Sequence, residues 1–261
     1  MDLFALMQSQ LGFFLLIFVR ISGLFIMAPI FGSRNITGRV KAGLALLITY
    51  ILFPIVFDQT AIIPDHFMTY LFVVAGELLV GLILGFVSSL IFTAIQMAGQ
   101  LLDMQVGFGM IHTIDPMSGL QAPLIGNFKY ILALVTFLAT NGHHVILSAL
   151  FASFKLIPVT GMVVHTGITE FIINIVGGMF ILALKISAPI LVSLLLTDVA
   201  LGILARTMPQ MNIFVVGVPG KIIIGIFVLS IALPFYILFL EMAFDGMYKN
   251  IFSILSFFSR S

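Results

Sequence analysis

The residues that could carry out catalysis or bind a metal are few in this chain, and their spacing argues against both roles. The pair His143-His144 is the most suggestive. Adjacent residues on a helix point about 100° apart, and no HExxH pattern supplies the other groups of a zinc site. We therefore interpret both histidines as structural or interfacial, with Asn141 and Gly142 marking the start of a helix and Asn141 as its cap. No metal site is predicted.

Phosphate-binding and nucleophilic motifs are also incomplete. The run from Gly217 to Lys221 lacks the glycine spacing of a P-loop and the Ser or Thr that follows its lysine. Asp115 and Asp198 are too isolated in the sequence to predict a carboxylate pair. The chain has no Cys, which excludes a thiolate ligand or a Cys nucleophile, and no G-x-S-x-G element presents a serine. We predict that the protein is not an enzyme and has no cofactor.

The composition places these residues on helices in an apolar setting. Apolar residues make up 61% of the chain and charged residues only 8%, with a net charge of +1 that gives no support for nucleic-acid binding. Soluble proteins carry about 25% charged residues, so lipid or partner subunits must cover most of this surface. The apolar runs lack the alternation of a membrane barrel, which predicts an all-α, polytopic protein. Six segments can be traced, at residues 11–31, 42–57, 67–95, 130–151, 171–196 and 213–240.

The third segment continues past Ile95 with a polar face formed by Gln96, Gln100 and Asp103. A continuous helix from Phe67 to Gln105 would be about 58 Å long, whereas the hydrocarbon core is about 30 Å thick. The sequence leaves two alternatives open, because the helix either breaks or leaves the bilayer.

Helix-disrupting residues lie inside several segments. Proline bends a helix, and small residues let helices pack closely, as in Gly81-x-x-x-Gly85. These features favour kinked helices in a tightly packed assembly. The residues concerned are Pro29, Pro54, Gly177-Gly178, Pro189 and Pro234.

Four charged residues fall within apolar segments: Arg20, Glu77, Lys185 and Lys221. An unpaired charge at a bilayer centre costs about 2.5–3.5 kcal/mol or more. Lys221, beside Pro219 and Gly220, fits a side chain that snorkels to the interface. Arg20 and Glu77 have long apolar stretches on both sides, which favours positions facing a partner or a pathway. We predict that all four are charges at interhelical or subunit interfaces.

Two further segments differ from the rest. The stretch MQVGFGMIHTIDPMSG, from Met104 to Gly119, is broken by glycines and by Asp115-Pro116, so a helix is not expected. It is either an ordinary loop shielded by partners or an adaptable seal over an opening. The tail beyond Glu241 has apolar residues at helical spacing, which predicts an amphipathic helix on a membrane surface or a partner.

Taken together, several blocks resemble the FliR family of the flagellar protein-export gate, whose injectisome relatives are of the SctT type. The resemblance covers nearly the whole chain in the family's order. It rests on FVRISGLFIMAPIFGSRNITGRVKAGLALLIT, the loop MQVGFGMIHTIDPMSG, FLATNGHHVILSALFASFKLIP and LLTDVALGILARTMPQMNIFVVGVPGKIIIG. The Asn-Gly-His-His form looks flagellar rather than virulence-associated.

The resemblance implies a fold in which FliP-like helices (about residues 1–165) are fused to a FliQ-like hairpin and amphipathic tail (about 166–261). It implies an obligate hetero-oligomer with FliP and FliQ, associated with FlhB and FlhA, in the bacterial inner membrane at the flagellar basal body. This assembly would export unfolded flagellar proteins. Residues 106–121 would form a plug that closes the pore. The plug residues would be Phe108, Gly109, Met110, Ile111, Ile114, Asp115 and Pro116.

Two other functions compete with this one. The chain would be the equivalent subunit of a virulence type III secretion injectisome, or, more distantly, a secondary transporter. Charges and broken helices within the membrane motivate the transporter. That class predicts an internal repeat with paired helix breaks in the two halves, and no convincing repeat is found.

Overall fold

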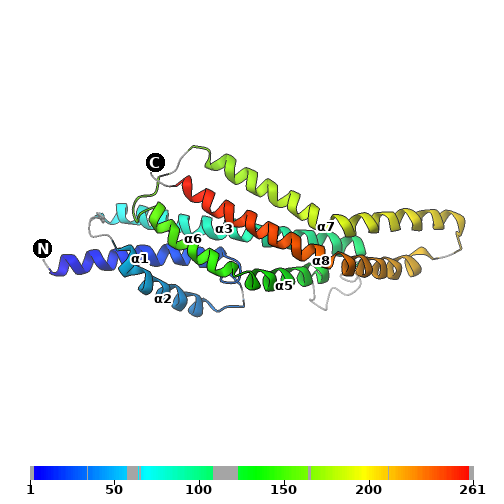
Figure 1. The fold of residues 1–261 in the computed structure, drawn as a ribbon, viewed down its shortest axis with the longest axis horizontal. Helices are drawn as coiled ribbons and strands as arrows, with labels where there is room; N and C mark the ends of the chain where they lie inside the picture. The colour runs from blue at the N-terminus through cyan, green and yellow to red at the C-terminus, as the bar shows by residue number, and fades with distance from the viewer. Residues whose placement is uncertain are drawn as a thin grey trace. The chain divides into compact units, whose positions relative to one another are not determined.

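In a computed structural model of the chain, residues 3–33, 35–57, 64, 66–107, 123–163, 166–210 and 212–258 are described. Every regular element within these ranges is an α-helix, which confirms the all-α prediction (Figure 1). Five of these helices are long and apolar enough to cross a membrane. The helices are α1 (Leu3–Met27), α2 (Gly38–Val56), α3 (Phe67–Val106), α5 (Leu124–Ala139), α6 (Gly142–Leu156), α7 (Ile168–Thr207) and α8 (Ile213–Ser256).

The length of α3 decides between the two alternatives for the third apolar segment. The helix is continuous over 40 residues, which makes it about 60 Å long. It therefore does not break, and part of it lies outside a hydrocarbon core about 30 Å thick unless it is strongly tilted. The helices extend beyond the last two apolar segments, because α7 and α8 run for 40 and 44 residues with Pro189, Pro219 and Pro234 inside them.

The fourth apolar segment, which was predicted as one span, contains two helices, α5 and α6, which together are long and apolar enough to form one broken span. Asn141 separates α5 from α6 with a φ of 58°, a left-handed conformation that ends a right-handed helix. The prediction that a helix starts at Asn141-Gly142 is confirmed. The predicted side-chain cap is wrong, because the backbone carbonyl of Asn141, not its side chain, accepts hydrogen bonds, from the N–H groups of His144 (2.9 Å) and Val145 (3.3 Å).

The chain packs into two compact units, each assembled from distant parts of the sequence. Unit 1 consists of Met1–Leu90, Asn141–Ile175 and Asp245–Ser261, and unit 2 of Ile91–Thr140 and Val176–Phe244. The predicted division at about residue 165 separates two consecutive parts of the sequence, whereas each compact unit combines segments from both of those parts. The FliP-like and FliQ-like nature of those two parts stays a prediction.

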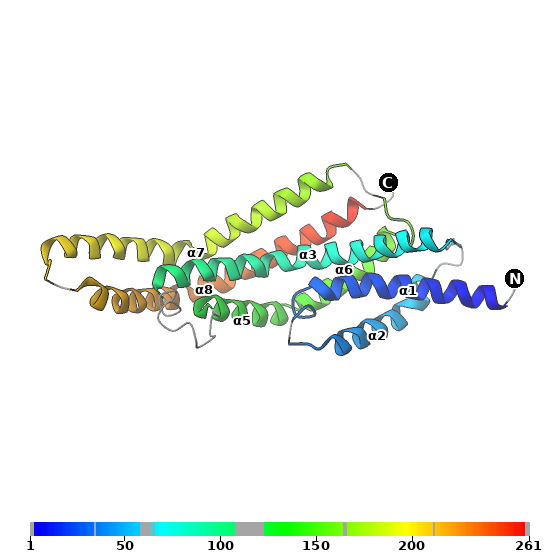
Figure 2. The same cartoon turned by 180° about the vertical axis from the view of Figure 1, so that it is seen from behind.

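In unit 1, α1 and α2 lie side by side and pack through aromatic residues (Figure 1 and Figure 2). The buried ring of Phe13 makes edge-on contacts with Phe53 (6.4 Å) and Phe57 (5.3 Å). The hydroxyl of Tyr70 donates to the carbonyl oxygen of Gly12 at 3.1 Å, which ties α3 to α1. Aromatic contacts therefore hold α1 against α2, and the Tyr70 hydrogen bond is one of the contacts that hold it against α3.

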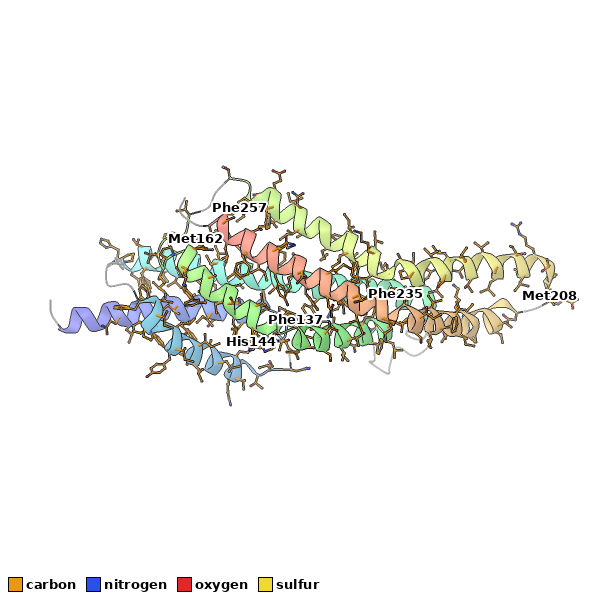
Figure 3. All side chains as sticks on the ribbon, in the orientation of Figure 1. Phe137, His144, Met162, Met208, Phe235 and Phe257 are labelled. Carbon is orange, nitrogen blue, oxygen red and sulfur yellow. The ribbon has the colours of Figure 1, made fainter. Side chains whose placement is uncertain are left out.

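The C-terminal tail is the amphipathic helix that was predicted, but its apolar face does not lie on a membrane surface. That face is buried within this chain, while Lys249 is exposed. Phe257, labelled in Figure 3, contacts Phe171 at 5.2 Å. The tail therefore belongs to the core of unit 1. Its buried residues are Met247, Ile251, Ile254, Leu255 and Phe258.

Among the described residues of unit 2, two groups of side chains pack closely. One is an aromatic cluster around Phe137, which is labelled in Figure 3; its ring contacts Phe92 (5.5 Å) and Phe244 (5.3 Å). The other is a set of fully buried aliphatic side chains that joins the end of α3 to α5 and α7: Leu102, Val106, Ile125, Ile190 and Leu194.

Glycine makes the contact between α1 and α3 close, as the Gly81-x-x-x-Gly85 spacing predicted. A Cβ added at Gly81 would lie 2.0 Å from the carbonyl oxygen of Arg20, and one at Gly85 would lie 2.9 Å from that of Leu24. From the other side, a Cβ at Gly23 would lie 2.7 Å from the carbonyl oxygen of Leu78. Backbone faces backbone here, so a side chain has no room.

Replacing Gly81 with Ala is expected to force α1 away from α3 and to lower the free energy of unfolding by about 1–3 kcal/mol. Gly43→Ala in α2 is the matched control, because a Cβ added at Gly43 would meet nothing within 4 Å. The control should be neutral or stabilising by up to about 1 kcal/mol, since Ala favours helix. Thermal unfolding in detergent measures both, and equal effects would contradict the close-packing explanation.

Candidate functional site

The predicted plug loop lies between α3 and α5. Its predicted plug residues fall outside the described residues, so they stay a prediction: Phe108, Gly109, Met110, Ile111, Ile114, Asp115 and Pro116. The two ends of the loop are described. On one side Val106 is fully buried and Gly107 adopts a φ of 99°, which favours glycine. On the other side Pro123 precedes α5.

Asp103 connects the two ends of this loop. One carboxylate oxygen accepts a hydrogen bond from the N–H of Ile125 (2.9 Å) and the other from the N–H of Gly126 (3.1 Å). These N–H groups belong to the first turn of α5 and have no partner within the helix. Pro123, at the N-cap position, makes no side-chain capping bond. A buried carboxylate from α3 therefore caps α5, and its charge suits the positive end of the helix.

Close packing brings Asp103 within reach of α5. A Cβ added at Gly99, one turn before Asp103, would lie 2.1 Å from the Cα of Gly126. The backbones of α3 and α5 thus touch at this pair of glycines. We call Gly99, Asp103, Ile125 and Gly126 the loop clasp. The sequence placed Asp103 on the polar face of the third helix. It did not identify the donors to this carboxylate, the N–H groups of Ile125 and Gly126.

Replacing Asp103 with Ala is expected to leave the first turn of α5 uncapped, at a cost of about 1–2 kcal/mol. Amide hydrogen exchange at Ile125 and Gly126 should become roughly 5–30 times faster. Exchange in Asp103→Asn should be intermediate between that of the unsubstituted protein and that of Asp103→Ala, because an amide oxygen keeps only part of the acceptor capacity. The amides of α6 serve as the internal control. Unchanged exchange at the start of α5 would mean that the clasp does not hold it.

A second group of polar residues lies beside the same end of α3. The Asp198 carboxylate of α7 accepts a hydrogen bond from Gln105 Nε2 at 2.8 Å and forms an ion pair with Lys221 of α8. These three residues line a cavity of about 300 Å³ together with Val106 and Gly107. Lys221, predicted as an interface charge, therefore has an acidic partner within its own chain. Sequence reasoning treated Asp198 as isolated, because its partners come from two other helices.

Two of the other predicted charges within apolar segments, Arg20 and Glu77, meet in unit 1. Arg20 Nε donates to Glu77 Oε2 at 2.6 Å, and the two side chains are 0% and 2% exposed. Arg20 Nη1 also donates to Ser153 Oγ (3.3 Å) and to the carbonyl oxygen of Ile157 (3.0 Å), while the guanidinium lies 4.4 Å from the ring centre of Phe154. One buried arginine therefore joins α1 to α3, α6 and the residues that follow α6.

Glu77 has a second function in this network. Its other carboxylate oxygen accepts a hydrogen bond from the N–H of Thr160 at 3.1 Å. Thr160 has a φ of 73°, which is strained for a β-branched residue and needs support from its surroundings. The carboxylate of Glu77 thus neutralises Arg20 and holds the turn after α6 in place.

The remaining predicted residues are placed as follows. Lys185 is exposed on α7 and lines a different cavity, considered below. The rings of His143 and His144 (the latter labelled in Figure 3) contact each other at 4.2 Å between centres. Over the described ranges, no three His, Cys, Asp or Glu residues cluster in a way that could hold a metal ion.

Comparison with known proteins identifies the family. The sequence profile of "Bacterial export proteins, family 1" matches residues 11–247. The flagellar biosynthetic protein FliR of Bacillus subtilis strain 168 is 40% identical over 224 residues, which cover 84% of this chain and 85% of that protein. The FliR proteins of Pectobacterium carotovorum (34% identical; 94% and 93% covered) and Escherichia coli K12 (30%; 91% and 90%) are also similar. The geometry of a polytopic helical protein and these matches agree, and the chain belongs to the FliR family of bacterial export proteins.

Proposed function

We propose that this chain is a core subunit of the flagellar type III protein-export gate in the bacterial inner membrane, at the flagellar basal body. In this role it assembles with FliP and FliQ, with FlhB and FlhA associated, into the channel through which unfolded flagellar proteins leave the cell. The observation that carries the proposal is the match to flagellar biosynthetic proteins along 84–94% of the chain.

The exposed surface of the helices supports an assembled state. Large apolar side chains are exposed on helices of both units, including Tyr50 (77%), Phe72 (79%) and Ile223 (69%). Exposed apolar surface on this scale needs lipid or another subunit to cover it. The few charges within the apolar segments are partly used inside the chain, as the pairs Arg20–Glu77 and Asp198–Lys221 show. An obligate hetero-oligomer in the membrane accounts for both features.

We further propose that the loop at residues 106–121 plugs the channel at rest. The clasp supports this role, because a single carboxylate holds both ends of the loop together. This anchoring keeps α3 and α5 joined at the two ends of the proposed plug. The helix α3 ends at Val106, whose side chain is buried, and Gly107 has a φ of 99°.

Purification of the tagged chain from its native membrane in a mild detergent tests the assembly. We expect FliP and FliQ to co-purify with it. Recovery of injectisome subunits in their place would assign the chain to that machine. Recovery of the chain alone, with solute uptake by the purified chain in liposomes, would overturn the gate proposal in favour of a transporter.

A further inference from the structure

A cavity in unit 2 contains two lysines and no acidic residue. It has a volume of about 240 Å³ and lies between α5, α7 and α8. Lys129 and Lys185 contribute the charge, and the rest of the wall is mainly apolar, with Pro189, Leu233, Phe235 and Phe239 among its residues. This volume has room for a compact polar group.

Lys129 is unusual because it is almost completely buried, with only 4% of its surface exposed. Its Nζ donates to the carbonyl oxygen of Ile186 at 3.3 Å and lies 4.9 Å from the ring centre of Tyr236. The Tyr236 hydroxyl donates to the Lys129 backbone carbonyl at 3.0 Å, which fixes the ring beside the ammonium group. An ammonium group has three donors, and one long hydrogen bond with one aromatic ring is weak compensation for its burial.

Within the described ranges, neither Lys129 nor Lys185 forms an ion pair; the pairs that form there are Arg20–Glu77 and Asp198–Lys221. The Asp103 carboxylate of the same unit is used by the first turn of α5. Two positive charges therefore lie at one small cavity with no negative charge from these residues to balance them. The missing component has the chemistry of an anion.

We propose that this cavity binds the phosphate of an anionic phospholipid. A phosphate group has several acceptor oxygens and can accept from both ammonium groups, whereas one carboxylate of a partner helix matches two lysines less well. A phospholipid combines a phosphate with acyl chains in one molecule, and the cavity combines two lysines with an apolar wall. The lysines match the phosphate and the wall matches the chains. Basic pockets between membrane helices bind anionic lipid headgroups for this reason.

The opening of the cavity suits the acyl chains. Phe235, labelled in Figure 3, lines the cavity and is 71% exposed. Leu238 and Ile231 on the same helix are 58% and 57% exposed. The chains of a lipid whose phosphate is held by Lys129 can therefore lie along an exposed apolar helix face. The proposal needs only a membrane-embedded chain and does not depend on the export-gate function.

A single tryptophan tests the proposal directly, because the chain has none of its own. We would introduce Phe235→Trp at the cavity and, as a matched control, Phe227→Trp, which is 65% exposed on the same helix and does not line the cavity. The full-length chain is reconstituted in phosphatidylcholine bilayers containing a minor fraction of brominated phosphatidylglycerol or, in parallel, brominated phosphatidylcholine. We expect stronger quenching by phosphatidylglycerol at position 235 and equal quenching at position 227.

Removing the charges should remove the preference. Lys129→Gln and Lys185→Gln in the Phe235→Trp background are each expected to lower the preference for phosphatidylglycerol about fivefold. Lys249→Gln, an exposed lysine elsewhere on α8, is the control and should change nothing. Lys185 is exposed, so its variant tests the proposal even if loss of the buried Lys129 prevents folding. Equal quenching by the two lipids in the Phe235→Trp protein with both lysines in place overturns the proposal. It would leave an acidic partner segment as the occupant.

Discussion

Replacing Glu77 with Leu is expected to lower the free energy of unfolding by about 3–5 kcal/mol, because Arg20 then remains as an uncompensated buried charge. The fully buried guanidinium keeps Ser153 and the carbonyl of Ile157 as partners, and both are neutral. The N–H of Thr160 also loses its acceptor, so the strained turn after α6 is no longer held. Denaturation of the detergent-solubilised chain, followed by circular dichroism, measures the loss.

The double variant Arg20→Leu/Glu77→Leu separates charge from packing. Removing both charges together should be milder than the Glu77→Leu single change, because no buried charge is left unpaired. Asp198→Asn is the matched control for loss of an ion pair. The Asp198–Lys221 pair is 36% and 20% exposed, so its loss should cost about 1 kcal/mol or less. If Glu77→Leu lowers the free energy of unfolding no more than Asp198→Asn does, the Arg20–Glu77 pair does not stabilise unit 1.

The same variants test the hypothesis that Arg20 and Glu77 support the assembly. Since the pair joins α1, α3 and α6, a loosened unit 1 should assemble less well with its partner subunits. Normal recovery of the complex and normal export from both single variants would remove that hypothesis. A defect that the double variant partly rescues would identify the unpaired charge as its cause.

The helices could largely be predicted from the sequence, whereas their ends could not. Apolar runs identify helices because a membrane leaves the backbone little choice of structure. Pro189 and Pro234 predicted bends within helices, and α7 and α8 do continue through them as single helices. Asn141 has the opposite effect, since a single left-handed residue ends α5 within a run that reads as one apolar segment.

Pairing between helices was beyond the reach of the sequence. Arg20 and Glu77 were identified because a charge in an apolar run is costly. They are 57 residues apart, and the packing of α1 against α3, close at Gly81, brings them together. Lys129 was missed because it immediately precedes the apolar run from Tyr130 and looked like an ordinary flanking charge. Its burial depends on α7 and α8, which follow much later in the chain.

Replacing the four apolar plug residues with Ser is expected to make the assembled gate leak ions at rest. The change comprises Phe108, Met110, Ile111 and Ile114 and keeps the length of the loop. Apolar side chains close a pore by excluding water, and hydroxyl groups hydrate it, so we expect conductance to rise at least about tenfold. Planar-bilayer recordings of the purified complex measure this directly.

Keeping the length matters because the clasp fixes both ends of the loop. A shortened loop should also leak, but it would pull on Asp103 and the start of α5, so a leak alone would not identify the plug. The serine variant leaves the clasp intact, whereas Asp103→Ala loosens the clasp and keeps the apolar residues. If the loop is a plug, the serine variant should leak strongly and Asp103→Ala should leak less. Unchanged conductance in a correctly assembled serine variant would contradict the plug. Equal leaks from the serine variant and from Asp103→Ala would assign the seal to the clasp, because loosening the anchor would then open the pore as fully as removing the apolar side chains.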